Sequence, residues 1–368
     1  MEVNIRFPAR TRALALMTLW LCLTPATLAE VTKTLRGELA ATGLPRFAVE
    51  NLAGIMRVRP GTGNTVIAIA TVHAESEALA GAVRLEQVTG ESGIPTLSVR
   101  YPLDHERTIR YPDPRDTRDW EFLDLFSSSS KYRYGGQTVR VSRHHGVLLY
   151  ADVEVQVPPG RLDAAFRNLV GSLEARGLEG RLRFEVESAD LRLDALSGDL
   201  ELQGSSGDTR ASDIRGGWRS NFSSGDCVLE RFEGDLLSFR TSSGDIHARS
   251  VKARRMEVET SSGDARIRDA DIEEFAADSS SGDIELDSTG GRLKAVRVGT
   301  FSGDVTVRLP SDASFEAEAD QSSGDLTVGF SDGSAVRHRD KLTAYRRGNG
   351  GSRIQLRTSS GDAVIEPR

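Results

Sequence analysis

The chain has 368 residues, with 47 lysines and arginines against 54 aspartates and glutamates, and a formal net charge of −7 at pH 7. This acidic balance argues against the basic surface that nucleic-acid-binding proteins present to phosphates, so no nucleic-acid partner is expected. The two cysteines, Cys22 and Cys227, are too few for a disulfide framework.

Residues 1–29 have the composition of a secretory signal peptide. Three arginines precede an apolar run from Ala13 to Leu23, and a small-residue pattern that ends at Ala29 favours cleavage before Glu30. No later stretch approaches the ~20 apolar residues that a membrane-spanning helix needs. The sequence therefore predicts an exported chain in the periplasm or at the cell surface, with no transmembrane segment in its mature form.

Residues 30–160 are expected to form irregular coils of β-strands. Gly54 and Gly146 each have apolar residues seven and five positions before them and two and four positions after them. The second half of the chain repeats this spacing more regularly. A period of two indicates strands with one face buried.

A long insertion interrupts these coils from Tyr101 to Tyr134, where the alternation stops and seven aromatic residues gather. A loop of this length is typically functional or disordered, and a disordered segment would be poor in aromatic residues. Aromatic rings on a loop suit sugar stacking or a protein partner. The candidate binding residues are Tyr111, Trp120, Phe122, Phe126, Tyr132 and Tyr134. Alternatively, these rings cover an edge of the stack that needs protection from strand addition.

From residue 161 to residue 368 the chain is a regular repeat. Between Ser197 and Asp362 the tripeptide Ser-Gly-Asp recurs, and from Gly207 to Gly324 its glycines are 18, 19, 19, 19, 21 and 21 residues apart. A fixed period of this length predicts stacked repeats, with strands pairing in parallel at ~4.8 Å per rung. The fold class is therefore an all-β parallel β-solenoid, or β-helix, with one chain winding through about 19–21 residues per coil and a long loop insertion. An amphipathic helix over Arg161–Arg176 is a competing interpretation of the first coil.

The Ser-Gly-Asp tripeptide is interpreted as corner chemistry. Glycine is expected to supply a positive φ, while serine and aspartate bind corner N–H groups that offset the repulsion between stacked carboxylates. A calcium-binding repeat is the alternative, although its Gly-Gly-x-Gly-x-Asp pattern matches poorly. The corner residues are Gly207, Asp208, Gly225, Asp226, Gly244, Asp245, Gly263, Asp264, Gly282, Asp283, Gly303, Asp304, Gly324, Asp325, Gly361 and Asp362.

The step from Gly324 to Gly361 is 37 residues, close to two periods. We expect a degenerate coil without the tripeptide in this interval, with a protruding loop at the glycines near residue 350.

No pattern in the chain indicates catalysis. Nucleophile elbows, phosphate loops and dinucleotide fingerprints are missing, and the histidines lack metal-ligand spacing. Cys227 falls in an inward slot of the repeat, which predicts a small core residue. The sequence therefore predicts neither an enzyme nor a cofactor. A polysaccharide-active enzyme on a β-helix scaffold is the alternative.

These repeats resemble a family of bacterial exported proteins that carry Ser-Gly-Asp at each coil, classed as adhesins of unknown function (domain of unknown function 4097). The resemblance covers residues 47–58 and most of 160–366. It implies a β-solenoid at or near the cell envelope, with no catalytic residues to transfer. The resulting hypothesis is an exported adhesin or scaffold, without catalytic activity, that binds an envelope protein or a surface glycan.

Overall fold

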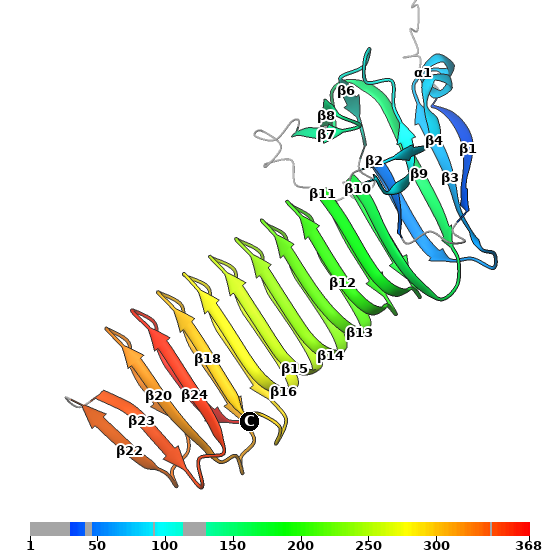
Figure 1. Cartoon of the computed structure of the whole chain (residues 1–368). Coiled ribbons are helices and arrows are strands. Elements are labelled where there is room, and N and C mark those ends of the chain that lie inside the picture. The colour runs from blue at the N-terminus through cyan, green and yellow to red at the C-terminus, as the bar shows by residue number, and fades with distance from the viewer. Residues whose placement is uncertain (1–29, 41–45, 91–92, 113–129, 339–340) are drawn as a thin grey trace, which may run out of the picture.

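The computed structural model describes residues 30–40, 46–90, 93–112, 130–338 and 341–368, and Figure 1 shows it as a long ladder of strands with a wider N-terminal end. Apart from one short helix, α1 (Glu77–Ala82), its named elements are all strands. The all-β prediction is confirmed. No helix of the described part is long and apolar enough to cross a membrane. The predicted signal peptide, residues 1–29, lies outside the described residues.

The first part of the ladder consists of strands that are mostly one coil long. They are β10 (Arg161–Arg176), β11 (Glu179–Asp194), β12 (Ser197–Gly204), β13 (Thr209–Phe222), β14 (Cys227–Thr241), β15 (Ile246–Thr260) and β16 (Ala265–Ser279). Successive coils pair in parallel, with each residue opposite one 18 or 19 positions later, as in Arg161 with Glu179 and Ile246 with Ala265. This register equals the sequence period, so each coil is one rung. Arg161–Arg176 is a strand and not the competing helix.

Each coil bends back on itself, so the segments before and after the corner glycine form two layers with the core between them. Inward residues alternate with exposed ones along both layers. The largest fully buried side chains include Phe166, Phe184, Trp218, Phe239 and Phe275. The rings of Phe166 and Phe184 stack on neighbouring rungs, with their centroids 5.8 Å apart. Burial of this narrow apolar column is the main stabilising contribution, at ~25 cal/mol per Å² removed from water.

The corner glycines are required because the rungs approach closely there. A Cβ atom on Gly263 would lie 2.0 Å from the carbonyl oxygen of Gly244 on the preceding rung. An equivalent clash with a neighbouring carbonyl, at 1.8–2.2 Å, would occur at Gly207, Gly225, Gly244, Gly282, Gly303, Gly324 and Gly361. The expected positive φ is present only at Gly207 and Gly225 among these corners, with φ of +117° and +101°. For the later corners the expectation was wrong: the constraint there is space, not the sign of φ.

The corner aspartates form a hydrogen-bonded ladder along one edge of the stack. Asp264 Oδ1 accepts the backbone N–H of Asp283 at 2.9 Å, and Asp283 Oδ1 accepts that of Asp304 at 2.8 Å. The successive acceptors are Asp190, Asp208, Asp226, Asp245, Asp264, Asp283, Asp304 and Asp362, and the last donor is Asp325. Neighbouring carboxylates at this spacing repel by about 1 kcal/mol in water. A hydrogen bond to a charged group contributes about 1.5–3 kcal/mol, which offsets that repulsion.

A threonine or serine three residues before the glycine closes the later corners. Thr260 Oγ1 accepts the N–H of Gly263 at 3.0 Å. The same bond occurs from Gly244 to Thr241, Gly282 to Ser279, Gly303 to Thr300 and Gly361 to Thr358. The sequence interpretation missed this residue, although the pattern Thr/Ser-x-Ser-Gly-Asp is visible in the aligned repeats.

The N-terminal part differs from the irregular coils expected over residues 30–160. Its strands are β1 (Val31–Ala40), β2 (Phe47–Pro60), β3 (Thr65–Ala74), β4 (Arg84–Thr89), β5 (Pro95–Arg100), β6 (Thr108–Arg110), β7 (Ser130–Tyr134), β8 (Gln137–Ser142) and β9 (Val147–Val157). β2 is a rung of the stack, with Gly54 opposite Gly171. In contrast, β3 pairs antiparallel with both β1 and β9, and β4 pairs antiparallel with β5. The antiparallel strands cover the open end of the stack, which would otherwise expose unpaired edges.

Gly146 does not occupy a corner equivalent to Gly54. A Cβ atom on Gly54 would lie 2.1 Å from the carbonyl oxygen of Ala151, so Ala151 is the neighbour in register. Asp152 follows it and accepts the N–H of Ile55 at 2.8 Å, as the ladder aspartates do. At this corner, Ala151 and Asp152 therefore take the place of the glycine and aspartate. The spacing of apolar residues around Gly146 predicted the corner at the wrong residue.

The last rungs are out of sequence order. The strands are β17 (Ile284–Ser288), β18 (Ala295–Thr300), β19 (Val305–Leu309), β20 (Phe315–Gln321), β21 (Leu326–Val328), β22 (Ser334–His338), β23 (Lys341–Arg347), β24 (Ser352–Thr358) and β25 (Ala363–Pro367). β24 pairs in parallel with β18 on one side and β20 on the other, and β25 lies likewise between β19 and β21. Figure 1 shows β24 between β18 and β20.

The degenerate coil expected between Gly324 and Gly361 is instead a hairpin. β22 and β23 pair antiparallel, and β23 pairs antiparallel with β20. The hairpin covers the edge of β20 at this end of the stack, and the chain then returns through Gly348, Gly350 and Gly351 to the inserted coil. The sequence interpretation was wrong here because a spacing of two periods does not distinguish a coil from a hairpin of similar length.

Replacing Gly263 by alanine tests the spatial constraint at the corner. The new Cβ has no room beside the Gly244 carbonyl, so we expect a loss of more than about 2 kcal/mol in the free energy of unfolding, measured by urea denaturation. Gly291→Ala is the matched control, because nothing lies within 4 Å of its added Cβ. The control should stay within about 0.5 kcal/mol of the parent chain. Equal effects of the two variants would contradict the constraint.

Substitutions of Asp304 separate hydrogen bonding from charge in the ladder. Asp304→Ala removes the acceptor of the Asp362 N–H, which lies 2.8 Å away, and should cost about 1 kcal/mol of stability. Asp304→Asn keeps a carbonyl oxygen at the same place and should cost clearly less. If the asparagine variant is as unstable as the alanine variant, the negative charge and not the acceptor is what matters.

Candidate functional site

The aspartate ladder uses its carboxylates for structure. One oxygen of each acceptor binds an N–H of the neighbouring rung, and Asp264 Oδ2 also pairs with Arg266 at 2.7 Å. Among the residues that the structure describes, no group of three or more histidine, cysteine, aspartate or glutamate side chains is placed to hold a metal ion. The arrangement accounts for the repeated aspartate through backbone contacts.

The tyrosines of the predicted binding loop lie in the core. Tyr111, Tyr132 and Tyr134 are 4%, 9% and 1% exposed. Tyr134 donates a hydrogen bond from its hydroxyl to the carbonyl of Val99 at 2.8 Å, and burial holds its pKa well above the usual value. Tyr132 donates to Ser188 Oγ at 2.9 Å. A buried ring has no face for a ligand, so these three tyrosines are packing residues of the N-terminal part of the protein.

The other three residues of that prediction, Trp120, Phe122 and Phe126, lie outside the described residues, and their binding role stays a prediction. The tyrosines were misassigned because aromatic content alone does not separate rings that bind from rings that pack. Their placement matches the alternative in which aromatic rings cover an edge of the stack.

Cys227 is a core residue. It is buried and free, opposite Thr209 and Ile246 on the neighbouring rungs. Burial raises the pKa of its thiol to about 12, with a smaller effect from the Asp226 carboxylate. A thiol with this pKa is almost wholly protonated at neutral pH and is a poor nucleophile.

The outer surface of the layer after the corner glycines is hollowed and rich in arginine. We call it the basic face. One hollow of about 740 Å³ extends over β2, β10, β11, β13 and β14, and a second of about 300 Å³ continues it over β14, β15 and β16. Eight arginines and three carboxylates line the two hollows: Arg57, Arg59, Arg176, Arg192, Arg210, Arg249, Arg266 and Arg268, with Glu174, Asp194 and Glu230. Among the lining residues, arginines outnumber carboxylates, on a chain whose net charge is −7.

The ion pairs of the basic face are open to solvent. Glu174 lies between Arg57 and Arg192, at 3.2 and 3.1 Å, so one carboxylate serves two guanidinium groups. The side chain of Arg268 makes no hydrogen bond or ion pair with the residues that the structure describes. Asp194 pairs with Arg176 at 3.0 Å, and carboxylates at the margins pair with the other four arginines, as Asp269 does with Arg249 at 3.3 Å. The ion-paired arginines of the basic face are 36–80% exposed. Such pairs contribute at most about 1 kcal/mol, and a ligand anion can replace them.

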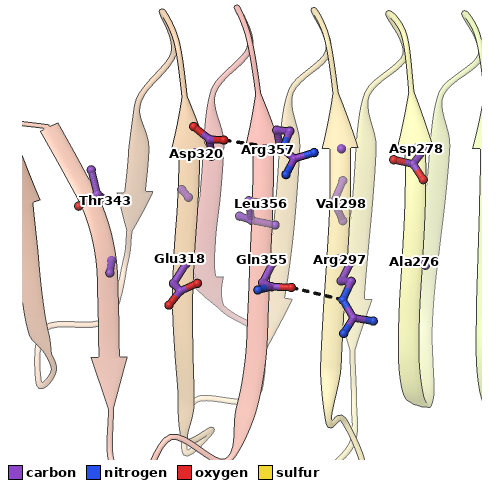
Figure 2. A pocket seen from close by; sticks show the side chains of 13 residues that line it. Ala276, Asp278, Arg297, Val298, Glu318, Asp320, Thr343, Gln355, Leu356 and Arg357 are labelled. Carbon is purple, nitrogen blue, oxygen red and sulfur yellow. Dashed lines mark hydrogen bonds and ion pairs between the residues drawn. The ribbon is translucent and has the colours of Figure 1, made fainter.

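The opposite layer carries a third hollow, which we call the mixed-charge groove. It measures about 660 Å³ and lies over β16, β18, β24, β20 and β23. Figure 2 shows its side chains, with Gln355 bonded to Arg297 and Arg357 paired with Asp320. Its charged residues are Asp278, Arg297, Glu318, Asp320 and Arg357. Acids outnumber bases here, so the two layers differ in the sign of their local charge.

Sequence comparison identifies the family. The model of Toastrack DUF4097 matches residues 149–366, more than half of the chain. The chain belongs to this family. The matched segment begins in β9 and includes every rung from β10 onward, so the match covers the stack apart from β2. The resemblance inferred from the Ser-Gly-Asp repeats is confirmed. No curated protein matches the chain.

Two solved structures resemble the chain at low identity. One is a candidate cell-adhesion protein from Clostridium sporogenes, 8% identical, with 92% of this chain and 100% of that chain covered and a TM-score of 0.20. The other is a candidate lipid-binding protein from Parabacteroides distasonis, 11% identical, with 91% and 96% covered and a TM-score of 0.37. At these TM-scores neither structure carries an argument about the fold or function of this family member.

The burial of Cys227 predicts its reactivity. In the folded protein, iodoacetamide at pH 8 should leave this thiol unmodified, because it is buried and protonated. In urea the same thiol should react at the rate of a free cysteine, which mass spectrometry of the mature chain detects. Rapid alkylation without denaturant would show that this part of the core opens, and that Cys227 is not a packed core residue.

Proposed function

We propose that the protein is an exported, non-catalytic binding protein of the cell envelope whose basic face binds an acidic surface glycan. The observation that carries the proposal is the pair of continuous hollows lined by eight arginines and three carboxylates. Guanidinium groups bind carboxylates in a planar, bidentate geometry. The predicted signal peptide favours a glycan over a nucleic acid as the anionic partner.

The spacing of the arginines suits a polymer. Arg192 and Arg210 occupy the same row on neighbouring rungs, and so do Arg249 and Arg268. Rungs are ~4.8 Å apart, so charged groups recur at short, regular intervals along the stack. A hollow of about 740 Å³ is within the ~300–1,000 Å³ that ligand sites occupy. An extended chain with a carboxylate on successive sugars would contact Arg192 and Arg210 on neighbouring rungs, and Arg249 and Arg268 farther along the stack.

Rigidity favours binding in this arrangement. Backbone pairing on both sides fixes every strand of the basic face, as the continuous registers from β2 to β16 show. The Cα atoms of the arginines are therefore held in place before binding. Less conformational entropy is lost on binding than if the same arginines lay on a flexible loop. This makes the face a better candidate than the predicted aromatic loop, whose described tyrosines are buried.

Binding of polygalacturonate, a carboxylate-bearing polysaccharide, tests the proposal. The mature chain should bind it with an affinity that falls as salt rises, and should leave the polymer intact. The variant Arg192→Gln, Arg210→Gln, Arg268→Gln should bind at least about tenfold more weakly, since each lost charged contact is worth about 0.5–1 kcal/mol or more. Isothermal titration calorimetry and light scattering measure affinity and polymer length.

The matched control removes three arginines from the opposite layer, through Arg219→Gln, Arg297→Gln and Arg357→Gln. It changes the net charge equally, so it should bind as the parent chain does. If both variants lose the same amount of affinity for polygalacturonate, the net charge of the protein explains the binding, and a site on the basic face is contradicted. Shortened polymer chains would instead favour an enzyme.

A further inference from the structure

The coil formed by β24 and β25, residues 352–367, fills a slot between two rungs that precede it in the chain. Leu309 ends the rung on one side and Phe315 begins the rung on the other. The connection between them passes over one rung position, a distance of about 9.6 Å at ~4.8 Å per rung. The chain thus leaves a vacant rung between two completed coils, and a later segment fills it.

The inserted coil fits the slot with the same contacts that join every other rung. Asp362 donates its N–H to Asp304 Oδ1 at 2.8 Å, and its own Oδ1 accepts the N–H of Asp325 at 2.9 Å. A Cβ on Gly361 would lie 2.0 Å from the Gly303 carbonyl oxygen, so the corner spacing is also kept. Its inward residues Ile354, Leu356, Ala363 and Ile365 are at most 3% exposed.

Side chains bind the coil to both of its neighbours. Arg297 Nε donates to Gln355 Oε1 at 3.3 Å, and Arg357 pairs with Asp320 at 3.7 Å, as Figure 2 shows on the two sides of β24. Arg308 donates to Glu366 at 2.8 Å in the other layer. These contacts are specified by the slot and the coil alone, and none depends on the two belonging to one molecule.

The segment that leads into the coil is suited to act as a hinge. Residues 348–351 read Gly-Asn-Gly-Gly, and Gly348 and Gly350 have φ of +61° and +72°. Glycine gives this link several backbone conformations at low cost. If the coil leaves its slot, the facing edges of β18 and β20 in one layer and of β19 and β21 in the other are exposed, and unpaired edges of this kind recruit a strand.

We propose that the coil of residues 352–367 is exchangeable, and that the slot of one molecule accepts this coil from a second copy. The exchange keeps every rung contact and changes only the course of residues 348–351, which is the condition for domain swapping at low cost. A reciprocal exchange joins two copies by their stacks. The basic face is on rungs outside the slot, so two basic faces would be held in one assembly.

Paired cysteines test the exchange in a chain of residues 30–368 that carries Cys227→Ser, so that neither Cys22 nor Cys227 is present. Arg297 and Gln355 are opposite each other on β18 and β24, a separation that a disulfide can bridge. One chain carries only Arg297→Cys and the other only Gln355→Cys. The two are unfolded in urea, refolded together and oxidised. Exchange predicts a disulfide-linked heterodimer, in a yield that rises with protein concentration because the event is bimolecular.

Two controls make the result decisive. A mixture of Ser238→Cys with Gln355→Cys places the first thiol on the same layer but on β14, away from the slot, and should give no dimer above random collision. A single chain with both Arg297→Cys and Gln355→Cys should close an internal disulfide at low concentration. A yield in the first mixture no greater than in the Ser238 mixture would overturn the proposal. An internal disulfide that fails to form would overturn the inserted topology on which it depends.

Discussion

The close approach of backbone at the corners is the constraint on which the rest of the structure depends. At Gly263 the carbonyl oxygen of Gly244 on the preceding rung occupies the place of a side chain, and the same holds along the stack. This contact keeps successive coils in one register, so Asp264 meets the N–H of Asp283 and inward residues meet their counterparts. A shift of one residue would turn the core residues outward. Corner geometry therefore fixes which side chains are buried and which are presented.

The same register gives the outer faces their character. Because each outward position recurs at every rung, a residue type that repeats in sequence becomes a row in space. Arg192 and Arg210 form such a row after the corner, while the outward positions before the corner carry the acidic and basic residues of the mixed-charge groove. The residues that line the hollows of both faces lie on strands and not on loops. Specificity is set by the side chains chosen at a few outward positions of each coil, which can vary without disturbing the core.

Much of the stack could be predicted from sequence, because its information is local and periodic. The spacing of Ser-Gly-Asp gave the coil length, and alternation around it identified inward residues such as Cys227 and Ile246, both buried. The basic face was not recognised, because its arginines are scattered in the sequence and gather only through the register. The buried Thr260 at the corner was visible in the repeat but was not interpreted. Tyr134 was assigned to a binding loop because the sequence does not show what a ring packs against.

The order of the rungs is what a repeat cannot encode. Every rung presents the same glycine, aspartate and alternating apolar residues to its neighbours, so the Ser-Gly-Asp at Gly361 fits equally well after Gly324 or between Gly303 and Gly324. The antiparallel hairpin of β22 and β23 decides between them: it occupies the edge of β20 and leaves the next coil only the internal slot. The degeneracy that makes this insertion invisible in sequence is also what makes the coil chemically equivalent between copies. Uniform rungs stabilise the stack, but they do not specify which molecule supplies the inserted coil. In the proposed exchange, the course of the glycine-rich link, residues 348–351, decides that.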